Sequence, residues 1–252
     1  MRRFGWSLLG AGLLALGSVN MAFATAELEI VSGGTTLFLS DNGAVTCAGC
    51  ATFSPNDTNP ATGVINVNAT GLNGWSISIS TGSSNSPNCS GVTGPGCLDN
   101  TTITTISTGA GTLTVYFADS GFTTEPGFTV NESASSITGA AGTGATTMGF
   151  RSTAALPAPG SLSTLVGAQL GATDSVGVGG GFQGTSATGP FAGPQDLELV
   201  TTFTAGAGTS ASNPAAFNVD STILAAVPEP SAYLLLGTVL SLVGISRRRK
   251  RS

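Results

Sequence analysis

The side chains of this protein that could do acid–base chemistry are carboxylates, because the sequence contains no histidine. Three acids lie close together, Asp119, Glu125 and Glu132, around the stretch SGFTTEPGFTV. Glycoside hydrolysis needs two carboxyl groups that face one cleft at a defined separation. The spacing therefore raises the hypothesis of a carboxylate enzyme that acts on polysaccharide. Acids at strand ends on an acidic surface are more often simply solvated, so we favour a protein without catalytic residues.

Other common catalytic and metal-binding patterns are missing from the sequence. Catalysis by a Ser–His–Asp triad requires a histidine as its base, and GFQGTSATG lacks the G-x-S-x-G turn of serine hydrolases. Asp and Asn oxygens could bind calcium, but no D-x-D-x-D-G loop occurs. We therefore predict no metal site and no cofactor.

Four cysteines, Cys47, Cys50, Cys89 and Cys97, are the remaining reactive side chains. Cys47 and Cys50 form a C-x-x-C motif, but no βαβ pattern surrounds it as in a redox site, and the second spacing does not fit zinc. We expect two structural disulfides formed in an oxidising compartment. Three pairings are possible. We favour Cys47 with Cys50 and Cys89 with Cys97, because each pair lies within one turn-rich loop.

The elements that must position these side chains are predicted to be β-strands. In GWSISIS, Trp75, Ile77 and Ile79 alternate with serines, and GVINVNA and TLTVYFA alternate in the same way. Turn signals such as DNG, TGPG and EPG separate these and further strand candidates, namely ELEIVS, TTLFLS, TTITTIS, GFTV, LELVTTFT and AAFNVD. Many short strands with one apolar face predict an all-β fold, an antiparallel β-sandwich or jelly-roll-like domain. Residues 156–184 fit either a loop with a short helix or loosely ordered strand.

The first 26 residues have the three parts of a secretory signal peptide. Two arginines precede the apolar stretch WSLLGAGLLALGSV, which is short for a transmembrane helix. Two overlapping A-x-A patterns offer signal cleavage after Ala24 or after Ala26. We therefore expect a signal helix at 1–26, an exported β-sandwich at 27–226 and a separate C-terminal segment at 227–252.

Charge is distributed very unevenly along the chain. Seven of the eight basic residues lie in the two ends, which leaves Arg151 as the single basic residue between Glu27 and Ala226. That stretch holds 12 of the 13 acidic residues, so one positive against 12 negative charges gives a formal net charge of −11. Such a surface repels nucleic acid and anionic lipid. The sequence therefore excludes nucleic acid as a partner.

The chain ends in a short apolar stretch followed by a run of positive charge. Residues 231–245 would span roughly 22 Å as a helix, against about 30 Å for the hydrocarbon core of a membrane. Pro230 fits the first turn of such a helix but no deeper position. By the positive-inside rule the last basic residues stay on the cytoplasmic side, and these are Arg247, Arg248, Arg249, Lys250 and Arg251. We expect a marginal transmembrane helix that anchors the exported body temporarily in the inner membrane.

The order of these parts resembles a PEP-CTERM sorting signal: the motif Val227-Pro228-Glu229-Pro230-Ser231, then a short apolar helix, then a terminal arginine run. In that family the signal is recognised by exosortase, an integral-membrane cysteine transpeptidase of Gram-negative bacteria that cuts near the Pro-Glu-Pro. The resemblance implies export to the cell surface or into an extracellular polysaccharide matrix. The alternative is an ordinary C-terminal membrane anchor.

Together these features predict a non-enzymatic exported protein with a structural or adhesive role in a polysaccharide matrix or biofilm. The expected partners are exosortase, the inner membrane through the C-terminal helix before processing, and extracellular polysaccharide. Two alternatives stay open: a secreted carboxylate-based enzyme that acts on polysaccharide, and a surface protein that stays anchored in the membrane.

Overall fold

The computed structural model describes residues 26–41, 43, 45–49, 57, 61, 63–84, 97–122, 127–153, 162, 167–179, 182–187 and 195–225. All the secondary-structure elements in this part of the chain are β-strands, which confirms the all-β prediction. It contains no helix with the length and apolar character needed to span a membrane. The predicted signal helix and C-terminal transmembrane helix lie outside the described residues.

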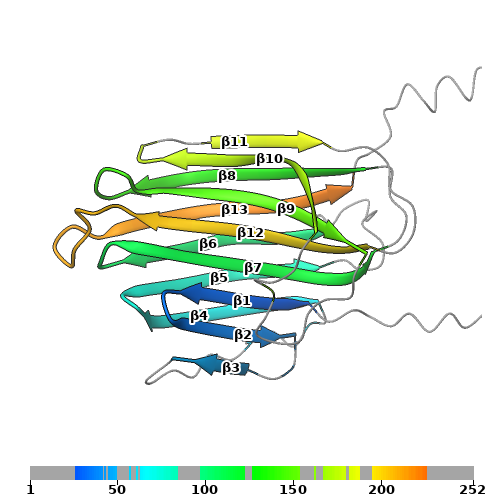
Figure 1. The fold of residues 1–252 in the computed structure, drawn as a ribbon, viewed down its shortest axis with the longest axis horizontal. Helices are drawn as coiled ribbons and strands as arrows, with labels where there is room; N and C mark the ends of the chain where they lie inside the picture. The colour runs from blue at the N-terminus through cyan, green and yellow to red at the C-terminus, as the bar shows by residue number, and fades with distance from the viewer. Residues whose placement is uncertain are drawn as a thin grey trace, which may run out of the picture.

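The strands form two antiparallel sheets (Figure 1). The seven-stranded sheet has the order β10-β9-β12-β7-β1-β2-β3, and the six-stranded sheet has the order β11-β8-β13-β6-β5-β4. The bounds are β1 Glu27–Ser32, β2 Thr35–Ser40, β3 Val45–Ala48, β4 Val64–Leu72, β5 Trp75–Ser84, β6 Leu98–Ser107, β7 Gly111–Phe122, β8 Phe128–Thr138, β9 Gly144–Ser152, β10 Ala168–Gly177, β11 Phe182–Ala187, β12 Gln195–Ala205 and β13 Ala215–Ala225.

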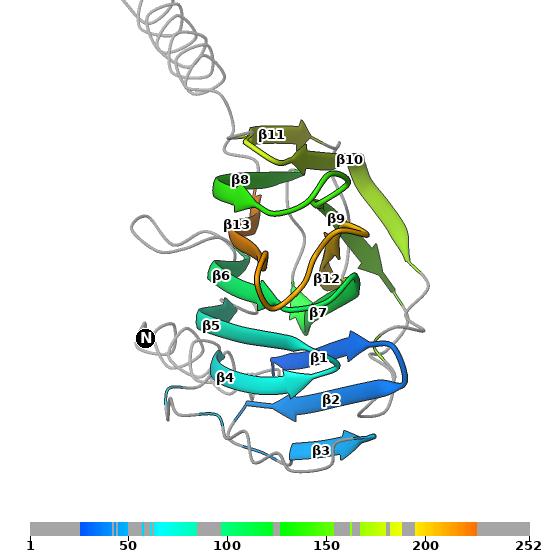
Figure 2. The same ribbon diagram turned by 90° about the vertical axis from the view of Figure 1, so that its left-hand side faces the viewer.

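The two sheets pack face to face as a β-sandwich, and Figure 2 shows the two layers from one end. One continuous apolar core lies between them. The side chains predicted to share a face do so: Trp75, Ile77 and Ile79 are all buried on the core side of β5. The ring of Phe217 on β13 lies 5.7 Å from that of Trp75 and 5.3 Å from that of Phe203, measured between centroids. The contact of Phe217 with Phe203 joins the two sheets, and its contact with Trp75 lies within the six-stranded sheet.

The connections cross repeatedly from one sheet to the other. β6 and β7 are consecutive strands in opposite sheets, and so are β8 and β9, and β12 and β13. In the seven-stranded sheet β12 lies between β7 and β9, and in the six-stranded sheet β13 lies between β6 and β8. The chain therefore wraps around the sandwich, and its final strand lies inside a sheet.

The predicted strands all occur, and four further strands occur that the sequence did not predict. β1 and β2 have the predicted bounds. The unpredicted strands are β3, β9, β10 and β11. β10 and the start of β11 fall in residues 156–184, so strand is the correct alternative for residues 168–177 and 182–184.

Candidate functional site

The residues of the sorting motif and the basic tail, from Val227 to Arg251, lie outside the described residues. The last described residue, Ala225, ends β13, which pairs with β8 there. The described strands thus end one residue before the predicted C-terminal segment at 227–252 begins. Both ends of the described chain lie at the same end of the sandwich (Figure 1).

The expectation that the candidate acids are solvated is wrong for the two that the structure describes. Asp119, on β7, is 1% exposed, and Glu132, on β8, is 0% exposed. Both side chains follow the alternation of their strands onto the core side. They have different neighbours: the charge of Asp196 acts on Asp119, and the charge of Asp174 acts on Glu132. Glu125 lies outside the described residues.

Asp119 belongs to a group of acids at the end of the sandwich where β1 starts. Its Oδ1 accepts a hydrogen bond from the backbone N–H of Ser120 at 2.7 Å. Burial raises its pKa to about 6, hydrogen bonds from Ser84 and Ser120 lower it, and the charges of Asp196 and Asp41 raise it further. Asp41 accepts a hydrogen bond from the N–H of Gly63 at 2.6 Å. Backbone donors thus hold several acids in a small space.

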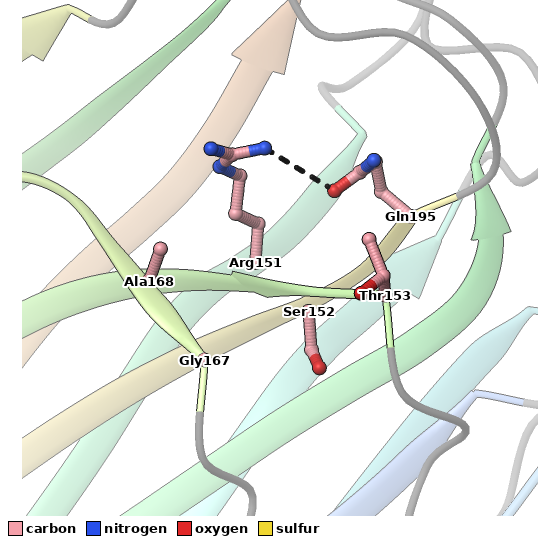
Figure 3. A pocket seen from close by; sticks show the side chains of 6 residues that line it. All are labelled: Arg151, Ser152, Thr153, Gly167, Ala168 and Gln195. Atoms are coloured by element: carbon pink, nitrogen blue, oxygen red, sulfur yellow. Dashed lines mark hydrogen bonds between the residues drawn. The ribbon is translucent and has the colours of Figure 1, made fainter.

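A pocket of ≈ 260 Å³ opens at this same end of the sandwich, where β9 ends and β10 and β12 begin. Figure 3 shows its lining, which consists of Arg151, Ser152, Thr153, Gly167, Ala168 and Gln195. The guanidinium of Arg151 points toward Gln195, and its Nη1 donates to Oε1 of that residue at 3.5 Å. The single basic residue of the sandwich therefore lines the pocket.

The local structure places Arg151 by strand pairing and by a close backbone approach. Arg151 is opposite Leu197 on β12 and opposite Ala168 on β10. A Cβ on Gly167 would overlap the carbonyl oxygen of Arg151, so only glycine allows β10 to begin this close to β9. Guanidinium, amide and hydroxyl groups give the pocket several hydrogen-bond donors. Such a lining can bind a ligand rich in oxygen acceptors, as sugars are.

Sequence reasoning did not find this pocket, although one signal pointed to it. Arg151 stands out in the sequence as the only basic residue between the two ends. Nothing in the spacing showed that Gln195, 44 residues later, would lie beside it. Strand β9 was not predicted, so its end could not be placed.

Two further buried acids lie on the outer face of the seven-stranded sheet. Glu29, on β1, accepts a hydrogen bond from the N–H of Leu162 at 2.5 Å. Glu198, on β12, is 2% exposed, and its Oε1 has no hydrogen-bond partner among the described residues. Burial raises the pKa of Glu198 to about 8, and the charge of Glu29 adds to this shift. Phe38, Ala118 and Leu162 form a small apolar cluster on this face, with Tyr116 packed against it.

Of the four cysteines, Cys47 and Cys97 lie within the described residues, and neither is a free thiol. Cys47 is exposed on the edge strand β3, and Cys97 is buried directly before β6. Cys50 and Cys89 lie outside the described residues, so the pairing of the cysteines stays a prediction. Among the described residues no group of three or more His, Cys, Asp or Glu side chains is placed to hold a metal ion.

Comparison with known families gives one match. Residues 226–251 match the model of the PEP-CTERM protein-sorting motif. This confirms the resemblance seen in the sequence. A search of curated proteins found no match to this chain.

Two solved structures show a distant likeness to the sandwich. The adhesin domain of Epf from Streptococcus pyogenes is 6% identical, with a TM-score of 0.37 over 81% of this chain and 62% of that one. The chain therefore spans less than two thirds of that structure. TmCBM61 in complex with β-1,4-galactotriose is 10% identical, with a TM-score of 0.28 over 50% of this chain and 70% of that one. TM-scores this low establish no common fold or function.

Proposed function

The chain ends in a PEP-CTERM protein-sorting motif, which implies an extracellular protein sorted by exosortase, and from this premise we propose its role. It is a non-enzymatic protein of the cell surface or extracellular matrix, cut by exosortase near Pro228-Glu229-Pro230. Before that cut, its C-terminal helix holds it in the inner membrane. Its role in the matrix or biofilm is structural or adhesive, and its partner there is polysaccharide.

The observation that carries the proposal is the position of the motif directly after the sandwich. β13 ends at Ala225, and the motif begins at residue 226. A cut near Pro230 would therefore leave every described strand in the released body. In the sequence, two prolines in four residues disfavour helix at the cleavage point.

The pocket at Arg151 supports polysaccharide as the partner. Its guanidinium, amide and hydroxyl groups can donate to sugar hydroxyls, and an arginine can also pair with the carboxylate of an acidic sugar. Arg151→Gln should reduce retention of the protein on the matrix polysaccharide of its own host by at least tenfold. Ser212→Ala is the matched control, because Ser212 is exposed on the turn between β12 and β13 at the opposite end of the sandwich. Equal retention of the two variants would contradict binding at this pocket.

The intact mass of the protein from its native host tests the sorting step. We expect a mass that lacks both the signal peptide and everything after about residue 230. In a strain without exosortase, the measured mass should include the C-terminal segment. A native mass that keeps Arg247 to Ser252 would contradict the proposal and favour a permanently anchored surface protein.

A second candidate function is a secreted enzyme that acts on polysaccharide through carboxylates. Asp119 favours it, because a carboxyl group with a pKa near 6 can serve as a general acid. Loss of glycan turnover in a double Asp119→Asn, Glu125→Gln variant, with folding retained, would support it. Glycan turnover that is unchanged in the variant, or that is absent in the parent protein, would count against it.

A further inference from the structure

A layer of hydroxyl groups crosses the otherwise apolar core between the two sheets. Thr147 on β9 and Thr201 on β12 share a hydrogen bond between their hydroxyls of 3.1 Å. The hydroxyl of Thr201 also lies 3.2 Å from that of Ser221 on β13. All three residues are buried. The second of these hydrogen bonds joins one sheet to the other.

Glu132 lies beside this layer on β8, the strand next to the edge of the six-stranded sheet. It is opposite Ser221 in the pairing of β8 with β13, and its strand neighbours Val130 and Ala134 face the core. Glu132 is 0% exposed, and neither oxygen of its carboxyl group makes a hydrogen bond of good geometry among the described residues. Thr147 is close enough to lower the pKa of this carboxyl group as a donor, but its hydroxyl is shared with Thr201.

A second carboxylate approaches from the edge strand β10, because that strand is irregular. Leu170 is opposite Gly149, but Asp174 is opposite Thr147, so the register of β10 against β9 shifts between Leu170 and Asp174. The extra residues form a bulge, which redirects the side chains of a strand. Asp174 thereby faces the same side as Thr147, and its charge acts on Glu132. Its Oδ2 is buried without a hydrogen-bond partner among the described residues.

A fully buried carboxylate beside a second, partly buried one is costly unless something else neutralises the two charges. The only basic side chain of the sandwich, Arg151, points to Gln195 at the end of the fold. Carboxylate and hydroxyl oxygens are the ligands that calcium prefers. We propose that Glu132 and Asp174, with the hydroxyl of Thr147, bind a calcium ion between the sheets at the β10 edge.

The small number of ligands sets the expected strength of this site. Two carboxylates fit the weak class of extracellular calcium modules, with dissociation constants of about 10⁻⁴ to 10⁻³ M. Burial, and then the charge of Asp174, raise the pKa of Glu132 to about 7.

Thermal unfolding of the processed protein at pH 8 tests the site directly. We expect 10 mM calcium chloride to raise Tm by about 3 to 10 °C over the value in EDTA. Glu132→Gln and Asp174→Asn should each abolish most of this shift. Asp220→Asn is the matched control and should keep it, because Asp220 lies on β13 with its side chain on the outer face.

The two variants differ usefully in their effect without calcium. Glu132→Gln removes a buried charge and keeps the shape, so its Tm in EDTA at pH 8 should equal or exceed that of the parent. If this variant does not fold, Asp174→Asn decides, because Asp174 is only partly buried. Calorimetric titration of the parent with calcium chloride should also show binding. The proposal would be overturned if calcium did not raise the Tm of the parent, or if it raised the Tm of both variants as much as that of the parent.

Discussion

Replacement of Glu198 by glutamine should change how stability depends on pH. Glu198 is 2% exposed, and burial together with Glu29 raises its pKa to about 8 from the ordinary 4.5. At low pH the carboxyl group is protonated in both the folded and the unfolded chain. As pH rises above 4.5, the unfolded chain loses this proton first, so unfolding becomes easier until the pH passes 8. Glu198 therefore stabilises the fold in acid and loses that contribution as the pH rises.

The size of this effect follows from the gap between the two pKa values. At about 1.4 kcal/mol per pKa unit, Glu198 alone should lower the free energy of unfolding by about 3 kcal/mol between pH 5 and pH 8. Glu198→Gln keeps the shape and removes the charge. The variant should equal the parent at pH 5 and exceed it by about 3 kcal/mol at pH 8. Other acids with raised pKa values keep part of the pH dependence in the variant, namely Glu27, Asp99, Asp119 and Glu132.

Urea unfolding of the processed protein at intervals between pH 5 and pH 8 measures this directly. The slope of the unfolding free energy against pH should be smaller in Glu198→Gln than in the parent. Asp220→Asn is the control, because it removes a carboxylate far from Glu198 on the outer face of the other sheet. If parent and Glu198→Gln lose stability in parallel, the pKa of Glu198 is the same in the folded and the unfolded chain, and the reasoning is wrong.

Three further predictions follow from the packing and the backbone. Phe217→Ala should cost about 3 to 5 kcal/mol of unfolding free energy in urea, because its ring fills the space beside Trp75; a loss below about 1 kcal/mol would contradict this. Gly74→Ala should lower the urea midpoint, since Gly74 has φ +86° in the turn before β5, and an unchanged midpoint would contradict this. N-terminal sequencing should find Thr25 first, because Ala26 is 0% exposed and its carbonyl accepts a hydrogen bond at 2.9 Å. A start at residue 27 would refute that choice of cleavage site.

The strands that sequence predicts well are those whose core positions hold large apolar side chains. β1, β2, β4, β5, β7 and β12 alternate clearly between apolar and polar residues. The core positions of β9 hold instead Ala145, Thr147, Gly149 and Arg151. A Cβ on Gly149 would overlap Val130 of the opposite sheet, so the position needs glycine and offers no apolar signal. In β10 the bulge before Asp174 interrupts the alternation.

The proposed calcium site was partly visible in the sequence. Glu132 lies in FTVNESASS, where Phe128, Val130 and Ala134 occupy the alternate positions. This period of two already placed Glu132 on the core side, but its charge argued for solvent. The neighbour of Glu132 could not be predicted, because Asp174 reaches it only through the bulge in an unpredicted strand. The same limit applies to the pocket, whose residues come from three strands that meet only in the folded sheet.

The position of β13 determines when the domain can finish folding. β13 is the last strand among the described residues, yet it bonds to β6 on one side and to β8 on the other. Until residues 215–225 have emerged from the export channel, the six-stranded sheet consists of two separate parts. The sorting motif follows at residue 226. The sheet can therefore close only when the residues directly before the sorting motif are in place.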